Sequence, residues 1–235
     1  MILEYNCQST DWWEFLFTKT KFQKLGFWIS GGIDSAFSLW YTAYCITNKF
    51  WLLNQPWPET INREFSLLPI HGKDVTRKYT DSLPIATNIV KWIQNNLPKA
   101  PVQDLHIFDD LVECEEKGEY FKQEKHKLKK FGEIEIIVPS YSMNPPKEVM
   151  LQIPEMYNRR DSKRDYDHYP DWHDHRPLSG VDKKFIAYFY KHFKLEELIP
   201  LTVSCTGDQP MMPCKTCFWC HEKKWAFGVY DGSIK

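Results

Sequence analysis

Hydrophobic and polar positions along the first 140 residues predict repeated strand and helix units. A short apolar run at residues 24–30 ends at two glycines, and residues 34–50 then carry aromatic side chains at helical spacing. The same order, an apolar strand before an amphipathic helix, recurs at residues 65–70 and 82–97. Repeated units of this kind predict a parallel sheet that is covered by helices.

Further strands and helices are expected toward the C-terminus. Residues 105–108 and 134–138 are short apolar runs, and the charged segment 111–131 between them is typical of an exposed helix. Residues 181–193 again place apolar side chains at helical spacing. We therefore expect an α/β fold with a Rossmann-like parallel sheet and helices on both of its faces.

Residues 139–180 differ in composition from the segments on either side. They are rich in Pro, Asp, His, Arg and Tyr and show little periodicity. Long segments of this kind are more often functional loops than scaffold elements. We expect this segment to face a substrate.

Composition and charge narrow the classes of function. The chain has 235 residues, of which 43% are hydrophobic and 16% aromatic, as expected for a folded domain with a sizeable core. Thirty basic and 31 acidic residues leave a formal charge of -1, which provides no broad positive field for nucleic acid or an anionic membrane. Without a signal-like leader or an 18-residue apolar run, the sequence predicts a soluble, cytoplasmic protein that acts on a small molecule.

The loop Ser30–Ser35, Ser-Gly-Gly-Ile-Asp-Ser, lies between the first predicted strand and the first predicted helix. At such a place backbone N–H groups and the helix dipole can hold an anion, and two glycines let the backbone approach a phosphate closely. No lysine follows the glycines, which excludes the P-loop ending in Gly-Lys-Ser/Thr, and the dinucleotide glycine fingerprint is missing as well. The loop predicts a phosphate site of another kind.

Four of the seven cysteines are crowded near the C-terminus, in the spacing C-x8-C-x2-C-x2-C: Cys205, Cys214, Cys217 and Cys220. Four thiolates in one short segment can form a closed tetrahedral site, for which Zn²⁺ is the usual metal. Because sulfur would occupy every position, we expect a structural site with no place for a catalytic water. The other three cysteines stand apart, and we expect small buried side chains there.

The glycine loop resembles the PP-loop of the N-type ATP pyrophosphatases. In that family the loop holds the pyrophosphate end of ATP, AMP is transferred to a carboxylate or carbonyl oxygen, and a nucleophile then displaces AMP. The resemblance implies ATP and Mg²⁺ as cofactors and pyrophosphate contacts from Ser30, Gly31, Gly32, Asp34 and Ser35. It also implies that Asp34 lies near Mg²⁺ and that Asp34 and Ser35 are the catalytic residues.

Two further segments narrow the resemblance. The tail, with Leu201–Cys205, Pro213–Cys217 and Cys220, is similar to the terminal segment of the 7-cyano-7-deazaguanine (preQ0) synthase family, and residues 165–171 with Arg176 resemble its substrate loop. That resemblance implies an adenine nucleotide alpha hydrolase-like fold and a carbon–nitrogen ligase of queuosine biosynthesis. The ligase would convert 7-carboxy-7-deazaguanine and free ammonia to the nitrile with ATP.

The resemblance also assigns contacts with the deazapurine to five side chains: Asp165, Tyr166, Tyr169, Asp171 and Arg176. It divides the chain into an ATP-binding core at 1–140, a substrate loop and helix at 141–200, and a zinc-binding segment at 201–235. It is compatible with a homodimer and gives no role to a membrane or to nucleic acid.

Departures from the family pattern leave alternatives open. His71–Asp74 stands where the family has Tyr-Gly-Gln, and residues 111–131 contain no counterpart of its Ala-Arg-Asn segment. One alternative is therefore a divergent PP-loop ligase that acts on another carboxylate. The others are a tRNA-thiolating PP-loop enzyme and a catalytically silent zinc-module protein that binds a partner.

Overall fold

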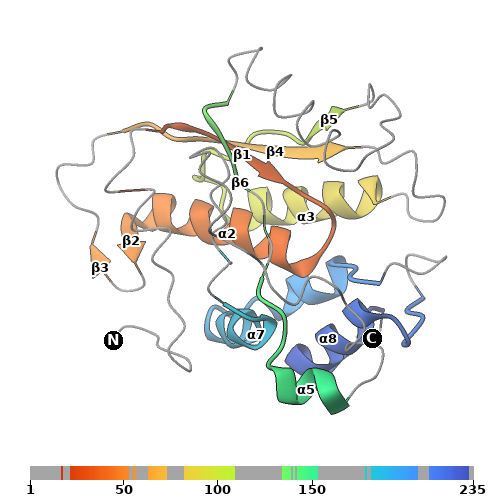
Figure 1. Ribbon diagram of the computed structural model, residues 1–235. Helices are drawn as coiled ribbons and strands as arrows, with labels where there is room; N and C mark the ends of the chain where they lie inside the picture. Colours follow the sequence, from red (N-terminus) through yellow and green to blue (C-terminus); the bar gives the residue numbers. More distant parts are fainter. Residues whose placement is uncertain are drawn as a thin grey trace.

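The computed structural model describes residue 17 and residues 22–52, 55–56, 63–72, 82–108, 134–138, 140, 142–152, 178, 181–205 and 212–232. The elements discussed below are labelled in Figure 1. In chain order they are β1 (Lys24–Trp28), α2 (Ile33–Asn48), β2 (Phe50–Leu52), β3 (Gln55–Pro56), β4 (Ser66–Gly72), α3 (Leu83–Asn96), β5 (His106–Phe108), β6 (Ile136–Val138), α5 (Lys147–Gln152), α7 (Lys183–His192), the 3-10 helix η3 (Glu196–Leu201) and α8 (Phe218–Phe227).

The four strands expected from the apolar runs form one parallel sheet in the order β5-β4-β1-β6. The register places Gly26 of β1 between Leu68 of β4 and Ile137 of β6. β1 and β4 occupy the centre, and their apolar runs fit because a central parallel strand is buried on both faces. The fold is therefore an α/β fold of the Rossmann-like kind, as predicted.

The strand order reverses at one place in this sheet. The chain moves from β1 to β4 to β5 in one direction, and β6 then lies on the other side of β1. In open α/β sheets the crevice at such a reversal, beyond the carboxyl ends of the strands, is where ligands bind. The reversal between β1 and β6 puts the glycine loop after β1 at this crevice.

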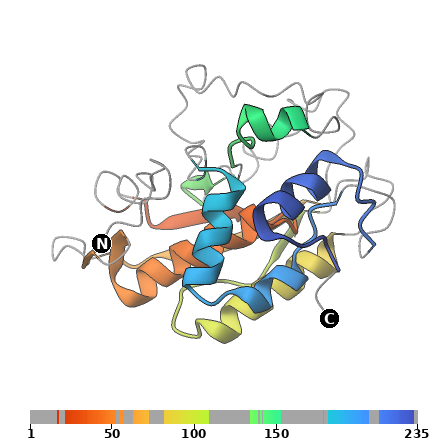
Figure 2. The ribbon, with the colours of Figure 1, turned by 90° about the horizontal axis from the view of Figure 1, so that it is seen from below.

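Two helical layers lie on one side of the sheet. α2 and α3 cover the sheet, α7 packs against α2 from below, and α8 packs against α7 (Figure 1, Figure 2). Phe37 and Tyr41 of α2 lie 5.5 and 5.6 Å, between ring centroids, from Phe189 of α7. The aromatic spacing thus predicted the helix correctly, but these two rings face the second helical layer.

Within the described ranges, no helix has the length and apolar character needed to cross a bilayer.

The opposite face of the sheet carries a small apolar cluster of Leu68, Ile70 and Ile134, against which Trp28 and Ile137 pack. These side chains face away from α2 because neighbouring residues of a strand point to opposite faces. The helix expected at residues 111–131 lies outside the described residues. Helices on both faces of the sheet therefore remain a prediction.

Some expected boundaries and one expected loop were wrong. The first helix, expected to reach residue 50, ends at Asn48 because Lys49 takes a left-handed conformation with φ 56° that closes the last turn. An antiparallel pair, β2 and β3, follows it and was not predicted, since both strands are very short. The segment 139–180 is not wholly irregular: it contains α5, and Met143 pairs with Asp182 at the start of α7.

Candidate functional site

The glycine loop has a backbone shape that requires glycine at one position. Gly31 has φ +86°, and a Cβ atom there would stand 3.1 Å from Cγ2 of Ile85. Residues with a side chain rarely adopt this conformation. Gly32 is different, because it has an ordinary extended backbone and serves as the N-cap of α2. The first glycine turns the chain, and the second starts the helix.

Two serine hydroxyls close the loop on itself. Ser35 donates its hydroxyl hydrogen to the carbonyl oxygen of Gly32 at 2.9 Å. Ser30 Oγ accepts from the Gly32 amide at 3.3 Å and lies 3.3 Å from Ser35 Oγ. The loop is therefore held in one shape by its own side chains, which is the preorganisation that a phosphate site needs.

The N-terminus of α2 opens onto the loop. Its N-cap, Gly32, makes no side-chain capping hydrogen bond, and the first intrahelical bond runs from Ala36 N–H to Gly32 O at 3.2 Å. Helix N-termini carry a partial positive charge and unpaired N–H groups that attract anions. An anion at this position would thus interact with the amides of the first turn of α2.

Asp34, in the first turn of α2, contacts the segment after β6, across the place where the strand order reverses. Its Oδ2 accepts from Ser142 Oγ at 2.8 Å, and Ser142 follows strand β6. Its Oδ1 is buried and has no hydrogen-bond partner among the described residues. A buried carboxylate oxygen without a partner is costly, and a hard divalent cation is a suitable ligand for it. Asp34 Oδ1 is therefore an atom of this site that could accept a cation.

Lys183, the first residue of α7, reaches the same carboxylate from the second helical layer. Its Nζ lies 3.6 Å from Asp34 Oδ2 and 2.5 Å from Oε2 of Glu222 on α8. The lysine and Glu222 are only 6% and 2% exposed. Asp182 holds this end of α7 in place as the N-cap, because its side chain accepts from the amide of Phe185 at 3.0 Å.

The sequence predictions did not include Ser142, Lys183 or Glu222. A signal was present for two of them, because Lys183 shares a helical face with Ile186 and Glu222 lies one turn after Phe218. A charged residue on an apolar helix face is unusual unless it is paired. No such signal marked Ser142, which lies in an irregular segment.

His71, at the carboxyl end of β4, supports the loop from its other side. Its Nδ1 lies 2.7 Å from the carbonyl oxygen of Ile29. Because a carbonyl oxygen only accepts, Nδ1 carries a proton and donates it to this oxygen, and Nε2 lies 3.3 Å from the Ser82 hydroxyl. The imidazole thereby ties the end of β1 to the start of α3.

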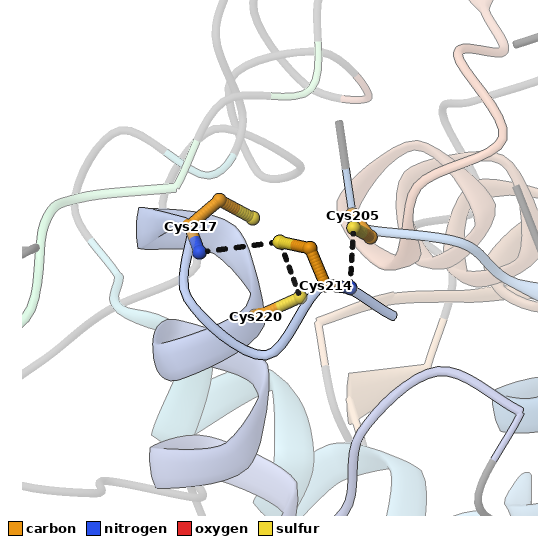
Figure 3. Close-up of side chains that lie close together, drawn as sticks. All are labelled: Cys205, Cys214, Cys217 and Cys220. Atoms are coloured by element: carbon orange, nitrogen blue, oxygen red, sulfur yellow. Dashed lines mark hydrogen bonds between the residues drawn. The ribbon is translucent and has the colours of Figure 1, made fainter. Parts of the chain in front are cut away.

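The four C-terminal cysteines converge on one point, as the spacing predicted. Their sulfur atoms all lie within 4.8 Å of one another, and Cys214 Sγ and Cys220 Sγ are 3.9 Å apart (Figure 3). Four sulfurs at about 2.3 Å from a tetrahedral Zn²⁺ stand about 3.8 Å from one another. The cluster could therefore hold a metal ion with little rearrangement.

The backbone around the cluster favours thiolates. Cys214 N–H donates to Cys205 Sγ and Cys217 N–H to Cys214 Sγ, both at 3.3 Å (Figure 3). Burial acts to raise the pKa of Cys214, but hydrogen bonds from Thr216 and Cys217 outweigh it and lower this pKa to about 6. Burial and the neighbouring thiols raise the pKa of Cys220. Four adjacent thiolates therefore need a bound cation to be stable together.

A buried ion pair anchors the first cysteine. Asp231 Oδ2 accepts from the amides of Ser204 and Cys205 at 2.8 and 2.7 Å, and its Oδ1 pairs with Lys223. Lys223 also donates to the carbonyl oxygen of Thr202 at 3.0 Å. The segment 202–205 is thus fastened to α8 on either side of Val203.

The remaining predicted site residues have two different outcomes. The five substrate contacts, Asp165, Tyr166, Tyr169, Asp171 and Arg176, lie outside the described residues and stay predictions. Cys45 is buried in α2, as expected for a cysteine outside the cluster. Burial raises the pKa of its thiol, which makes a catalytic role unsuitable.

A surface cavity of about 800 Å³ lies away from these groups. It is lined by the first residues of three strands, Lys24, Ser66 and His106, together with residues 102–105. These are the amino ends of the strands, whereas the glycine loop follows the carboxyl end of β1. The cavity is therefore separate from the site that the reversal in strand order marks.

No protein-family model and no curated protein matches the chain. Its own geometry establishes an α/β protein with a four-stranded parallel sheet, a glycine loop at the reversal of strand order, and a four-cysteine cluster that could hold a metal ion.

Proposed function

We propose that this chain is an ATP-dependent ligase that binds the pyrophosphate end of ATP at Ser30–Ser35 and adenylates a carboxylate. The position of Asp34 carries the proposal. This residue lies in the first turn of α2, at the reversal of strand order, with a buried oxygen that has no partner among the described residues. A divalent cation bound to a polyphosphate would satisfy that oxygen.

Each part of the loop has a role in this proposal. The amides in the first turn of α2 would receive phosphate oxygens, and the left-handed turn at Gly31 lets the backbone come close. Asp34 would hold Mg²⁺, with Ser142 fixing the orientation of its carboxylate. When bound, the cation would offset the negative charge that builds on the departing pyrophosphate.

The reaction proceeds in two displacements and a dehydration. A carboxylate oxygen of the acceptor attacks the α-phosphorus, the bond from that phosphorus to the bridging oxygen breaks, and pyrophosphate leaves. Ammonia then attacks the acyl carbon, AMP leaves, and loss of a proton gives the amide. Activation of the amide oxygen by a second ATP allows its departure with the two amide protons lost, and a nitrile results.

We propose 7-carboxy-7-deazaguanine as the acceptor, with the nitrile 7-cyano-7-deazaguanine as the product. The support is the resemblance of residues 165–176 and of the cysteine tail to the preQ0 synthase family. The four cysteines would hold a structural Zn²⁺, because their sulfurs occupy all positions of a tetrahedral site.

The direct test is incubation of the protein with ATP, Mg²⁺, ammonia and 7-carboxy-7-deazaguanine. Mass spectrometry should detect the nitrile, and phosphate analysis should detect AMP and pyrophosphate. AMP release with another carboxylate alone would keep the ligase and change the acceptor. Absence of nucleotide binding in an intact, metal-loaded protein would overturn the proposal.

Two substitutions connect the activity to the loop. Asp34→Ala removes the proposed Mg²⁺ ligand, and Ser35→Ala removes the hydroxyl that closes the loop. Both should abolish AMP formation and leave the metal content of the cysteine cluster unchanged. A double variant that still forms AMP would contradict the assignment of the loop.

The second candidate is a tRNA-thiolating enzyme. The observation behind it is the group of four adjacent cysteines, which in such an enzyme would hold an iron–sulfur cluster. The close approach of the sulfurs, all within 4.8 Å, suits one ion better than a cluster of several iron atoms, whose ligands stand further apart. Metal analysis and an absorbance spectrum of protein purified without oxygen separate the two. Iron at one cluster per chain would decide against the zinc assignment.

A further inference from the structure

One lysine lies between two carboxylates near the glycine loop, the buried Glu222 and the partly buried Asp34. Lys183 Nζ lies 2.5 Å from Glu222 Oε2, within hydrogen-bond distance, but 3.6 Å from Asp34 Oδ2, beyond it. Of these two carboxylates, Glu222 therefore holds the ammonium group more closely. Asp34 receives its hydrogen bonds on Oδ2 from Ser142, and its Oδ1 stays without a partner among the described residues.

This unequal sharing matters for a cation at Asp34. A divalent cation and the Lys183 ammonium would compete for one carboxylate, because each is attracted by the same negative charge. An ammonium that is fully paired with Asp34 would weaken cation binding there. An ammonium that is paired with a second carboxylate leaves Asp34 available.

The second carboxylate cannot easily move away. Glu222 is 2% exposed, and it lies two residues after the metal-ligand candidate Cys220 on α8. The next residue, Lys223, is fixed by Asp231 and by Thr202. This part of α8 is therefore held against the segment around Thr202, and α8 also packs directly on α7, so that Glu222 stays close to Lys183.

We infer that Glu222 is a positioning residue for the cation and phosphate site. It acts through Lys183: by taking the ammonium group, it keeps the Asp34 carboxylate free to bind Mg²⁺ with the nucleotide. Because Glu222 lies on α8, whose N-cap is Cys217, the cysteine cluster also sets the position of this carboxylate. The inference rests on the proposed function and adds a residue of the second helical layer to it.

The test is Glu222→Gln, which keeps the shape of the side chain and removes its charge. Lys183 should then pair with Asp34, and the Mg²⁺ concentration for half-maximal binding of α,β-methylene ATP, a noncleavable analogue, should rise by roughly fivefold or more. Calorimetry measures this binding without turnover. Mn²⁺ binding followed by electron paramagnetic resonance should weaken in parallel, in the absence of nucleotide.

A double variant separates positioning from a general structural role. Lys183→Met in the Glu222→Gln background removes the competing ammonium, so the Mg²⁺ requirement should return toward that of the unaltered protein. A purely structural role predicts no such rescue. The exposed Glu197 in η3 provides the charge control, because Glu197→Gln should leave the Mg²⁺ requirement unchanged.

The outcomes distinguish this inference from the proposed function. An unaltered Mg²⁺ requirement in Glu222→Gln, in protein that keeps its metal and binds the analogue, overturns the positioning role and leaves the ligase proposal standing. If the unaltered protein, loaded with metal, binds neither the cation nor the analogue, both proposals are overturned. A raised requirement that the double variant reverses supports the inference.

Discussion

The backbone amide of Val203 donates a hydrogen bond to the carbonyl oxygen of Gly31 at 2.9 Å. Val203 stands two residues before Cys205, so the segment that enters the cysteine cluster also touches the glycine loop. Gly31 is the loop residue with the left-handed backbone. The cluster and the loop, far apart in the sequence, are therefore joined by a direct backbone contact.

Removal of the metal from the cysteine cluster should weaken the loop. Cys217→Ser deletes one proposed ligand at the N-cap of α8, so we expect loss of bound metal and a fall in the melting temperature of about 6–12 °C, which corresponds to about 3 kcal/mol. Affinity for the Mg²⁺ complex of ATP should fall with it. Metal analysis, thermal unfolding and calorimetry measure the three effects.

The control for this prediction is a chelator. Treatment of the unaltered protein should reproduce both losses, and added Zn²⁺ should restore the unaltered protein better than Cys217→Ser. Retention of full nucleotide affinity by a metal-free protein would show that the contact between Val203 and Gly31 does not depend on the metal.

Gly31→Ala should remove nucleotide binding. The substitution forces a side chain into φ +86° and brings Cβ to 3.1 Å from Ile85, at a cost of about 1–2 kcal/mol in stability. The loop can relieve that strain only by changing the shape on which the proposed nucleotide binding depends. Calorimetry with the noncleavable analogue, beside urea unfolding, measures the two effects.

Gly228→Ala is the matched control. Gly228 also has a left-handed backbone, at φ +74°, but no atom within 4 Å would meet its Cβ, and it lies at the C-cap of α8. We expect a comparable loss of stability from backbone strain with unchanged nucleotide affinity. Equal losses of affinity in the two variants would mean that stability alone controls binding.

The buried pair of Lys223 and Asp231 should be important for stability. Burial lowers the pKa of Lys223, while the charge of Asp231 opposes that shift. Asp231→Ala leaves the lysine without its carboxylate and the amides of Ser204 and Cys205 without their acceptor. The free energy of unfolding in urea should fall by about 3–5 kcal/mol.

An exposed carboxylate gives the comparison for that variant. Asp104→Ala removes an acceptor of Gln94 at the protein surface, where such contacts contribute about 1 kcal/mol or less. A loss in Asp231→Ala that is no larger than the loss in Asp104→Ala would contradict the anchoring role of the buried pair.

Cys45 should not react in the folded protein. Burial raises the pKa of its thiol, so at pH 8 the thiol is protonated and is enclosed in the core, and iodoacetamide should not modify it. After denaturation in urea the pKa returns to its ordinary range near 8.5 and modification should be complete. Peptide mapping by mass spectrometry measures the modification of Cys45 in the native and in the denatured protein. Labelling of Cys45 in the native protein would contradict its placement in the core.

Short-range patterns in the sequence were sufficient for the elements of the sheet and for the two chemical motifs. Apolar runs and helical spacings predicted β1, α2, β4 and α3, because each pattern reflects how a single element is buried. The glycine loop and the cysteine spacing were also readable, since all their members lie close together in the chain. Such predictions need no knowledge of how the elements pack.

The contacts that complete the site were decided by the tertiary structure. Ser142, Lys183 and Glu222 come from three separate segments. Ser142 and Lys183 reach Asp34, and Glu222 reaches Lys183, only when the chain folds with α7 and α8 beneath α2 (Figure 1). Sequence periodicity tells which face of a helix is buried but not which residue of another helix it meets. The sequence alone therefore determined the glycine loop and the set of four cysteines, whereas packing determined that Asp34 and Glu222, on the helix that carries Cys220, lie beside the same buried lysine.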